Sequence, residues 1–127
     1  MNNPNLSPSV AILGGTGKEG SGLALRWARA GYFVVIGSRS AERAAHTAHE
    51  INTQLGIDNT QGMDNESACM SADIVVLTVP PEAQLETLTG VKNLLAGKIL
   101  VDATAKVDAK DPKPPTGRSA AREAQDL

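Results

Sequence analysis

Short apolar segments that alternate with helical patterns restrict the fold of this 127-residue chain more than any other feature. The first two expected strands are continuous apolar runs, which are typical of strands buried on both faces. The third is weak and is assigned mainly because the alternation requires a strand there. We therefore predict an α/β fold, a doubly wound parallel sheet with right-handed crossovers. The expected strands are Val10–Leu13, Phe33–Ile36, Asn59–Gly62, Asp73–Val79 and Lys98–Asp102.

Helical patterns fill the segments between these strands. The first two predicted helices end at glycines, Gly31 and Gly56, and Ser40 is a suitable cap for the second. The residues expected to face the sheet are Leu23, Trp27 and Ala30 in the first helix and Ala44, Ala48, Ile51 and Leu55 in the second. The helical segments are Gly17–Ala30, the stretch between Ser40 and Gly56, Asn65–Met70, and a stretch from Pro80-Pro81 through Leu85 and Leu88.

Chain length and composition fit a single globular domain. Only three residues are aromatic, so the core is expected to be aliphatic and rich in alanine. We expect a disordered tail over residues 1–8, the domain over 9–104, a loop or linker over 105–118 and the start of a further helix over 119–127. Both a fragment of a longer protein and a naturally short protein remain open.

Charge and cysteine content exclude several classes of function. Twelve basic and fourteen acidic residues give a net charge of −2, which offers no general attraction for nucleic acid or anionic membranes. The single cysteine, Cys69, indicates a reducing compartment, and residues 1–9 lack the features of a secretory signal, so we expect the cytoplasm. His46 and His49 have no cysteine or third histidine to complete a metal site, so no metal is expected.

A glycine pattern, Gly15-x-Gly17-x-x-Gly20, follows the first strand directly and opens the first helix. In this context the glycines permit a tight turn, a close approach of backbone to a pyrophosphate, and close packing of helix on strand. The helix N-terminus presents free N–H groups to the anion. Thr16 adds a hydroxyl donor, whereas Lys18 and Glu19 offer main-chain contacts at most. The pattern favours a Rossmann-like dinucleotide-binding domain over a structural turn.

The end of the second strand favours NADP(H) over NAD(H). NAD-preferring domains carry a carboxylate there, whereas this chain has Gly37-Ser38-Arg39. Ser38 can donate a hydrogen bond to a 2′-phosphate, and Arg39 can pair with it and stack on adenine. Arg43 lies one helical turn further and is either a second cation for this phosphate or an ordinary surface arginine.

These motifs together resemble a known family. The segments Leu13–Gly17, Ile36–Arg39, Glu42–Ala44, Ala72–Asp73 and Leu77–Pro80 are similar, in the same order, to the NADPH-dependent reductases of the deazaflavin coenzyme F420. The resemblance covers about residues 9–104. It implies an oxidoreductase that passes a hydride between coenzyme F420 and NADP(H), and, by analogy, a homodimer.

The resemblance also implies roles for individual residues. Thr16 to Glu19 would meet the pyrophosphate, and residues at the ends of the last two strands would lie near the nicotinamide, although Thr78–Pro80 is equally well read as a plain strand end. No catalytic residue is expected, because hydride transfer needs mainly positioning. The expected cofactor-binding residues are Gly15, Thr16, Gly17, Lys18, Glu19, Ser38, Arg39, Arg43, Thr78, Val79, Pro80 and Ala103.

Departures from the family pattern keep other functions open. The segment Ala103–Val107 replaces a Thr-x-Pro type of sequence, and Arg118 stands where the family has a glycine. Two alternatives therefore remain: a non-catalytic NADP(H)-sensing module, and an NADP-dependent reductase of another small substrate, of the imine or pyrroline-carboxylate type.

Overall fold

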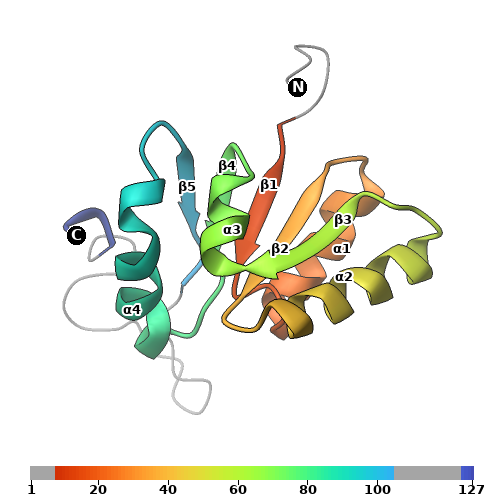
Figure 1. Cartoon of the computed structure of the whole chain (residues 1–127), viewed down its shortest axis with the longest axis horizontal. Coiled ribbons are helices and arrows are strands. Elements are labelled where there is room, and N and C mark those ends of the chain that lie inside the picture. The colour runs from red at the N-terminus through yellow and green to blue at the C-terminus, as the bar shows by residue number, and fades with distance from the viewer. Residues whose placement is uncertain (1–7, 105–123) are drawn as a thin grey trace, which may run out of the picture.

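The computed structural model describes residues 8–104 and 124–127. Its centre is one parallel sheet of five strands in the order β3-β2-β1-β4-β5, which confirms the predicted fold class. Figure 1 shows the strands side by side, with their carboxyl ends at the lower edge. The strands are β1 (Val10–Leu13), β2 (Val34–Ser38), β3 (Thr60–Asp64), β4 (Ile74–Leu77) and β5 (Ile99–Asp102).

Helices cover both faces of this sheet. One core cluster lies between the sheet and the first two helices, and a second lies between the sheet and the next two. Alternate side chains of the central strands enter the two clusters, which explains why these strands read as continuous apolar runs. The helices are α1 (Lys18–Arg29), α2 (Ala41–Leu55), α3 (Asn65–Met70) and α4 (Pro81–Val91), followed by the 3₁₀ turn η1 (Lys92–Leu94).

The predicted caps of α2 are confirmed. Ser40 Oγ accepts a hydrogen bond of 3.2 Å from the backbone N–H of Arg43, and Gly56 ends the helix with a φ of +67°. The start of α3 is capped by Asp64, whose carboxylate accepts 2.9 Å hydrogen bonds from both the backbone N–H and the hydroxyl of Ser67. These local contacts explain why α2 and α3 begin where they do.

The face that α1 presents to the sheet differs from the prediction. Ala24 and Ala28 are fully buried, whereas Leu23 and Trp27 pack at the side of the cluster and Ala30 is exposed. Small side chains allow the helix axis to approach the strands closely, so alanine and not the larger apolar residues occupies the contact line.

Strand boundaries also shift by a few residues. β2 and β3 continue to Ser38 and Asp64, beyond the predicted ends, because parallel pairing between them extends that far. β4 is shorter than predicted, ending at Leu77. β5 forms one edge of the sheet and leaves Ile99 and Val101 on one face 63% and 46% exposed.

The terminal predictions fall largely outside the described residues. The predicted tail and the predicted linker over residues 105–118 cannot be compared with the structure, and only 124–127 of the last predicted segment is described. Ala124 packs against the second core cluster. Within the described ranges, no helix is long and apolar enough to cross a membrane.

Candidate functional site

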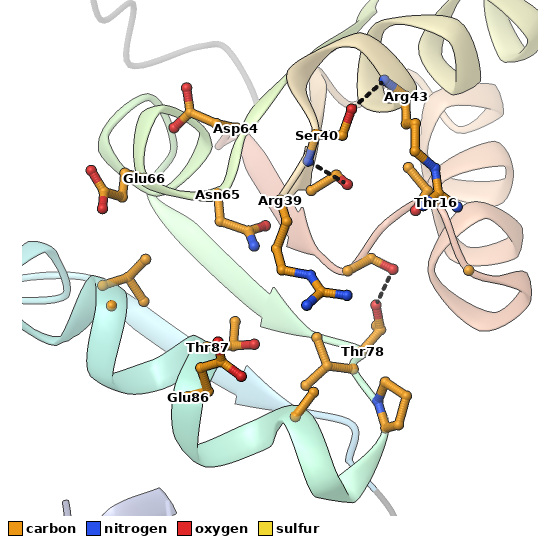
Figure 2. A pocket seen from close by; sticks show the side chains of 18 of the residues that line it. Thr16, Arg39, Ser40, Arg43, Asp64, Asn65, Glu66, Thr78, Glu86 and Thr87 are labelled. Atoms are coloured by element: carbon orange, nitrogen blue, oxygen red, sulfur yellow. Dashed lines mark hydrogen bonds between the residues drawn. The ribbon is translucent and has the colours of Figure 1, made fainter.

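A cavity of about 1100 Å³ opens at the carboxyl edge of the sheet. The loop between β1 and α1, the β2–α2 junction, the start of α3 and the β4–α4 connection form its walls. Figure 2 shows side chains from these segments converging from opposite sides on the same space. Parallel sheets bind their ligands at this edge, so the position of the cavity agrees with the predicted site.

The loop after β1 is folded by backbone hydrogen bonds. The N–H groups of Gly14 and Gly15 both donate to the carbonyl of Gly37 at 3.0 Å, and Gly17 N–H donates to Gly14 O at 3.2 Å. Gly14 has the left-handed φ, +76°, so the conformational role expected of Gly15 belongs to Gly14. The turn is therefore held against the end of β2, directly beside Ser38.

Three glycines of the loop have different steric surroundings. A Cβ on Gly15 would lie 2.8 Å from the carbonyl oxygen of Ile12, and one on Gly20 would lie 2.8 Å from the Cα of Gly15. A Cβ on Gly17 would meet only Gly14 O, at 3.6 Å, and Gly17 is exposed to the cavity. Gly15 and Gly20 are thus required by internal packing, whereas the chain itself leaves space beside Gly17.

Thr78 connects the same loop to β4. Its hydroxyl donates to Leu13 O at 2.9 Å and lies 3.3 Å from Gly14 O, and the side chain is almost fully buried. The backbone N–H of Thr78 donates to Leu13 O as well, at 3.0 Å. The hydroxyl of Thr78 therefore holds the loop after β1 in place, and Thr78 also lines the cavity.

The end of β2 supplies hydroxyl and guanidinium groups. Ser38 Oγ accepts from the N–H of Ser40 at 3.1 Å, which leaves its own hydroxyl proton available to a ligand. Arg39 points into the centre of the cavity in Figure 2, and Arg43 points toward Thr16 of the loop. Among the described residues, neither guanidinium forms an ion pair with a carboxylate. Two cations without acidic partners thus face the cavity at the N-terminus of α2.

Ten of the predicted cofactor-binding residues line this cavity together. They come from three separate segments of the sequence. Gly15 is buried in the turn, and Ala103 instead continues the β4–β5 pairing, donating its N–H to Leu77 O at 2.9 Å. The lining residues are Thr16, Gly17, Lys18, Glu19, Ser38, Arg39, Arg43, Thr78, Val79 and Pro80.

Sequence reasoning missed the wall formed by α3 and α4. The signal was available in part, because residues that follow β3 must also lie at the carboxyl edge. Asp64 is used structurally: hydrogen bonds from the backbone and hydroxyl of Ser67 lower the pKa of its carboxyl. The additional lining residues include Asn65, Glu66 and Met70 from α3 and Ala83, Glu86 and Thr87 from α4.

Other titratable residues have no part in the cavity. His46 pairs with Glu50 at 2.7 Å on the exposed side of α2. Cys69 is buried, and burial raises the pKa of its thiol. Over the part of the chain that the structure describes, no group of histidine, cysteine and carboxylate side chains could hold a metal ion.

The sheet order, the glycine turn at the first crossover and the cavity beside it define a Rossmann-type dinucleotide-binding domain. Residues 9–106 match the family model described as NADP oxidoreductase, coenzyme F420-dependent, and the chain belongs to this family. The resemblance noted in the sequence is thereby confirmed.

Individual relatives agree with this assignment. An F420-dependent NADP reductase from Methanothermobacter thermautotrophicus is 46% identical over 102 residues, covering 79% of this chain and 44% of the relative. A second, from Methanocaldococcus jannaschii, is 46% identical over 96 residues, which cover 72% of this chain and 43% of the relative. This chain thus spans less than half the length of these relatives.

Solved structures give the same fold. A crystal structure of a candidate F420-dependent NADP-reductase from Arthrobacter sp. FB24 matches with a TM-score of 0.72 at 27% identity, covering 94% of this chain and 58% of that one.

Proposed function

We propose that this chain binds NADP(H) and forms the NADP-binding part of an oxidoreductase that transfers hydride between NADP(H) and coenzyme F420. The observation that carries the proposal is the β2–α2 junction. Ser38, Arg39 and Arg43 lie together there without a carboxylate at the end of the strand. A 2′-phosphate, which distinguishes NADP(H) from NAD(H), carries the charge that these groups complement.

The pyrophosphate would lie at the N-terminus of α1. Gly17 is the N-cap of this helix, and no side chain occupies its cap hydrogen bonds. The first N–H groups of a helix have no intrahelical acceptors and carry a partial positive charge. The space beside Gly17 allows an anion to approach them, and Thr16 adds a hydroxyl at the rim.

The 2′-phosphate would lie between the two arginines. Ser38 contributes the hydroxyl proton that its hydrogen bond with Ser40 leaves free. The first N–H groups of α2 lie at the same place, since Ser40 is the cap of that helix. Guanidinium, hydroxyl and helix terminus all favour a dianion, so their effects add.

The nicotinamide would lie toward Thr78, Val79 and Pro80, at the end of β4. Bound NADP(H) supplies the hydride chemistry. The residues of this chain bind and orient the cofactor, because transfer between two aligned carbon centres needs no nucleophile and little acid–base assistance. We assign no catalytic residue in this chain. Ala103 and Thr104 lie at the end of the adjacent strand, but Ala103 is not part of the cavity wall.

Coenzyme F420 as the second substrate follows from family membership. We also propose that the protein is a homodimer and acts without nucleic acid. Its single cysteine, Cys69, supports a cytoplasmic location.

The test mixes NADPH and coenzyme F420 with the purified protein and follows hydride transfer by the change in F420 absorbance. It is carried out on this chain and on a longer protein in which the chain is joined to the remaining sequence of one of its relatives. We expect transfer at least with the longer version. NADPH binding without any transfer would favour the sensing module, and transfer to imines alone would favour a reductase of another small substrate.

A further inference from the structure

We propose that Asn65 recognises the adenine base of the bound cofactor through its side-chain carboxamide. This inference rests on the proposed NADP(H) function and assigns a specificity role to a residue outside the phosphate-binding motifs. Asn65 is the first residue of α3 and lines the cavity. In Figure 2 its carboxamide points toward the side chain of Arg39.

The position of Arg39 determines where the base would lie. With the phosphates at the α1 and α2 termini, the cavity beyond Arg39 is bounded by the start of α3 and by α4. A planar guanidinium stacks on an adenine ring, and Figure 2 shows Thr87 of α4 across the cavity from Arg39. A base in this space would direct one edge toward Asn65.

The carboxamide of Asn65 lies at the boundary between the cavity and the interior of the chain. Its Oδ1 is buried and has no hydrogen-bond partner among the described residues. The neighbouring Asp64 and Ser67 are already paired with one another in the cap of α3. A buried acceptor without a partner is costly, so turning this oxygen toward a hydrogen-bond donor on a ligand in the cavity would recover part of that cost.

Packing against β2 holds the carboxamide close to the site. A Cβ on Gly37 would lie 2.9 Å from Asn65 Oδ1 and 3.1 Å from the Cβ of Ala68. The absence of a side chain at Gly37 therefore makes room for the amide beside the strand that presents Ser38 and Arg39. In this position the oxygen faces the strand, so pairing with a base requires rotation of the side chain about its Cα–Cβ and Cβ–Cγ bonds, which turns the amide edge into the cavity without moving the helix.

A carboxamide matches the edge of a 6-aminopurine. Its oxygen accepts from the 6-amino group while its NH₂ donates to N7, a two-hydrogen-bond arrangement that side-chain amides form with adenine. Hypoxanthine, in which oxygen replaces the amino group, presents two acceptors on the same edge. A carboxamide can satisfy only one of them well.

The test compares NADPH with its hypoxanthine analogue, by calorimetry, on the wild-type chain, on Asn65→Ala and on Asn65→Asp. We expect the wild type to bind NADPH about tenfold more tightly than the analogue. In Asn65→Ala the ratio should fall to about one, mainly through weaker binding of NADPH. Asn65→Asp keeps the acceptor and removes the donor, so an intermediate ratio is expected.

The control is Asn93→Ala, the same change at an exposed position in η1 outside the cavity, which should keep the wild-type ratio. Circular dichroism establishes that each variant is folded. Tight NADPH binding with the same ratio in wild type and Asn65→Ala would overturn the role of Asn65 and leave the proposed function intact. Failure of the wild type to bind NADPH would instead remove the proposed function itself.

Discussion

A Cβ atom on Gly20 would lie 2.7 Å from Oγ1 of Thr78, the hydroxyl that donates to the carbonyl of Leu13 at 2.9 Å. The first turn of α1, the end of β1 and the end of β4 thus meet at one contact. Because no side chain at Gly20 separates them, the helix N-terminus lies directly at the carboxyl edge of the sheet. The position of the proposed pyrophosphate site depends on this contact.

Replacing Gly20 with alanine should therefore destabilise the fold. The added methyl group would also approach Gly14 O to 2.9 Å, and such overpacking costs about 1–3 kcal/mol. The measurement is the free energy of unfolding in urea. Gly22→Ala is the matched control two residues further along α1, where nothing lies within 4 Å of the added atom. It should stabilise the fold by about 0.5–1 kcal/mol, and similar effects of the two changes would contradict this packing.

Removing the hydroxyl of Thr78 should weaken the contact between the end of β4 and the end of β1. Thr78→Val keeps the shape of the side chain and loses the hydrogen bond to Leu13 O, at a cost of about 1 kcal/mol in unfolding free energy. Thr78→Ser keeps the hydroxyl and should lose less stability than Thr78→Val. If thermal and urea unfolding show the serine variant to be the less stable one, the hydrogen bond does not hold the loop.

Reversing the charge of Arg39 should weaken binding of NADPH far more than binding of NADH. Arg39→Asp places a carboxylate beside the proposed 2′-phosphate, so we expect the Kd for NADPH to rise about 10- to 100-fold and that for NADH to change much less. Arg29→Asp makes the same change in the last turn of α1, outside the cavity, and should leave the NADPH/NADH ratio as in wild type. Equal losses for both cofactors in Arg39→Asp would remove Arg39 from the 2′-phosphate site.

The hydrogen bonds that cap α3 should make the stability of the fold depend on pH in the acid range. Because Ser67 holds the pKa of Asp64 below its ordinary value of 3.8 in the folded chain, the unfolded state binds this proton more readily. The contribution of Asp64 to stability is therefore present above the unfolded pKa and is lost as the pH falls through the lower folded value. We expect the stability difference between wild type and Asp64→Ala to shrink as the pH falls from about 5 toward 2. A difference independent of pH would contradict this pairing.

Much of the fold follows from local sequence signals. Apolar runs predicted β1, β2, β4 and β5, whereas β3 was placed only because the alternation required a strand there. Ser40 predicted the start of α2, and Gly56 predicted its end. The contact face of α1 was not predictable in this way, because hydrophobicity favours Leu23 and Trp27, whereas close approach to the sheet favours Ala24 and Ala28.

In the candidate site too, some residues could be predicted from local sequence, whereas others depend on packing between distant segments. The phosphate loop and the β2 end carry their chemistry in short contiguous motifs, so Thr16, Ser38 and Arg39 could be found from the sequence. The wall that includes Asn65 depends on how the start of α3 packs against Gly37, 28 positions earlier in the sequence. Contacts over such a separation leave no local pattern.

The central claim is the preference for a 2′-phosphorylated cofactor, and calorimetric titration of the wild-type chain with NADPH and with NADH tests it most directly. We expect NADPH to bind at least about tenfold more tightly, since the end of β2 offers cations and no carboxylate. Equal affinity for both cofactors, tighter binding of NADH, or no binding of either would contradict the claim.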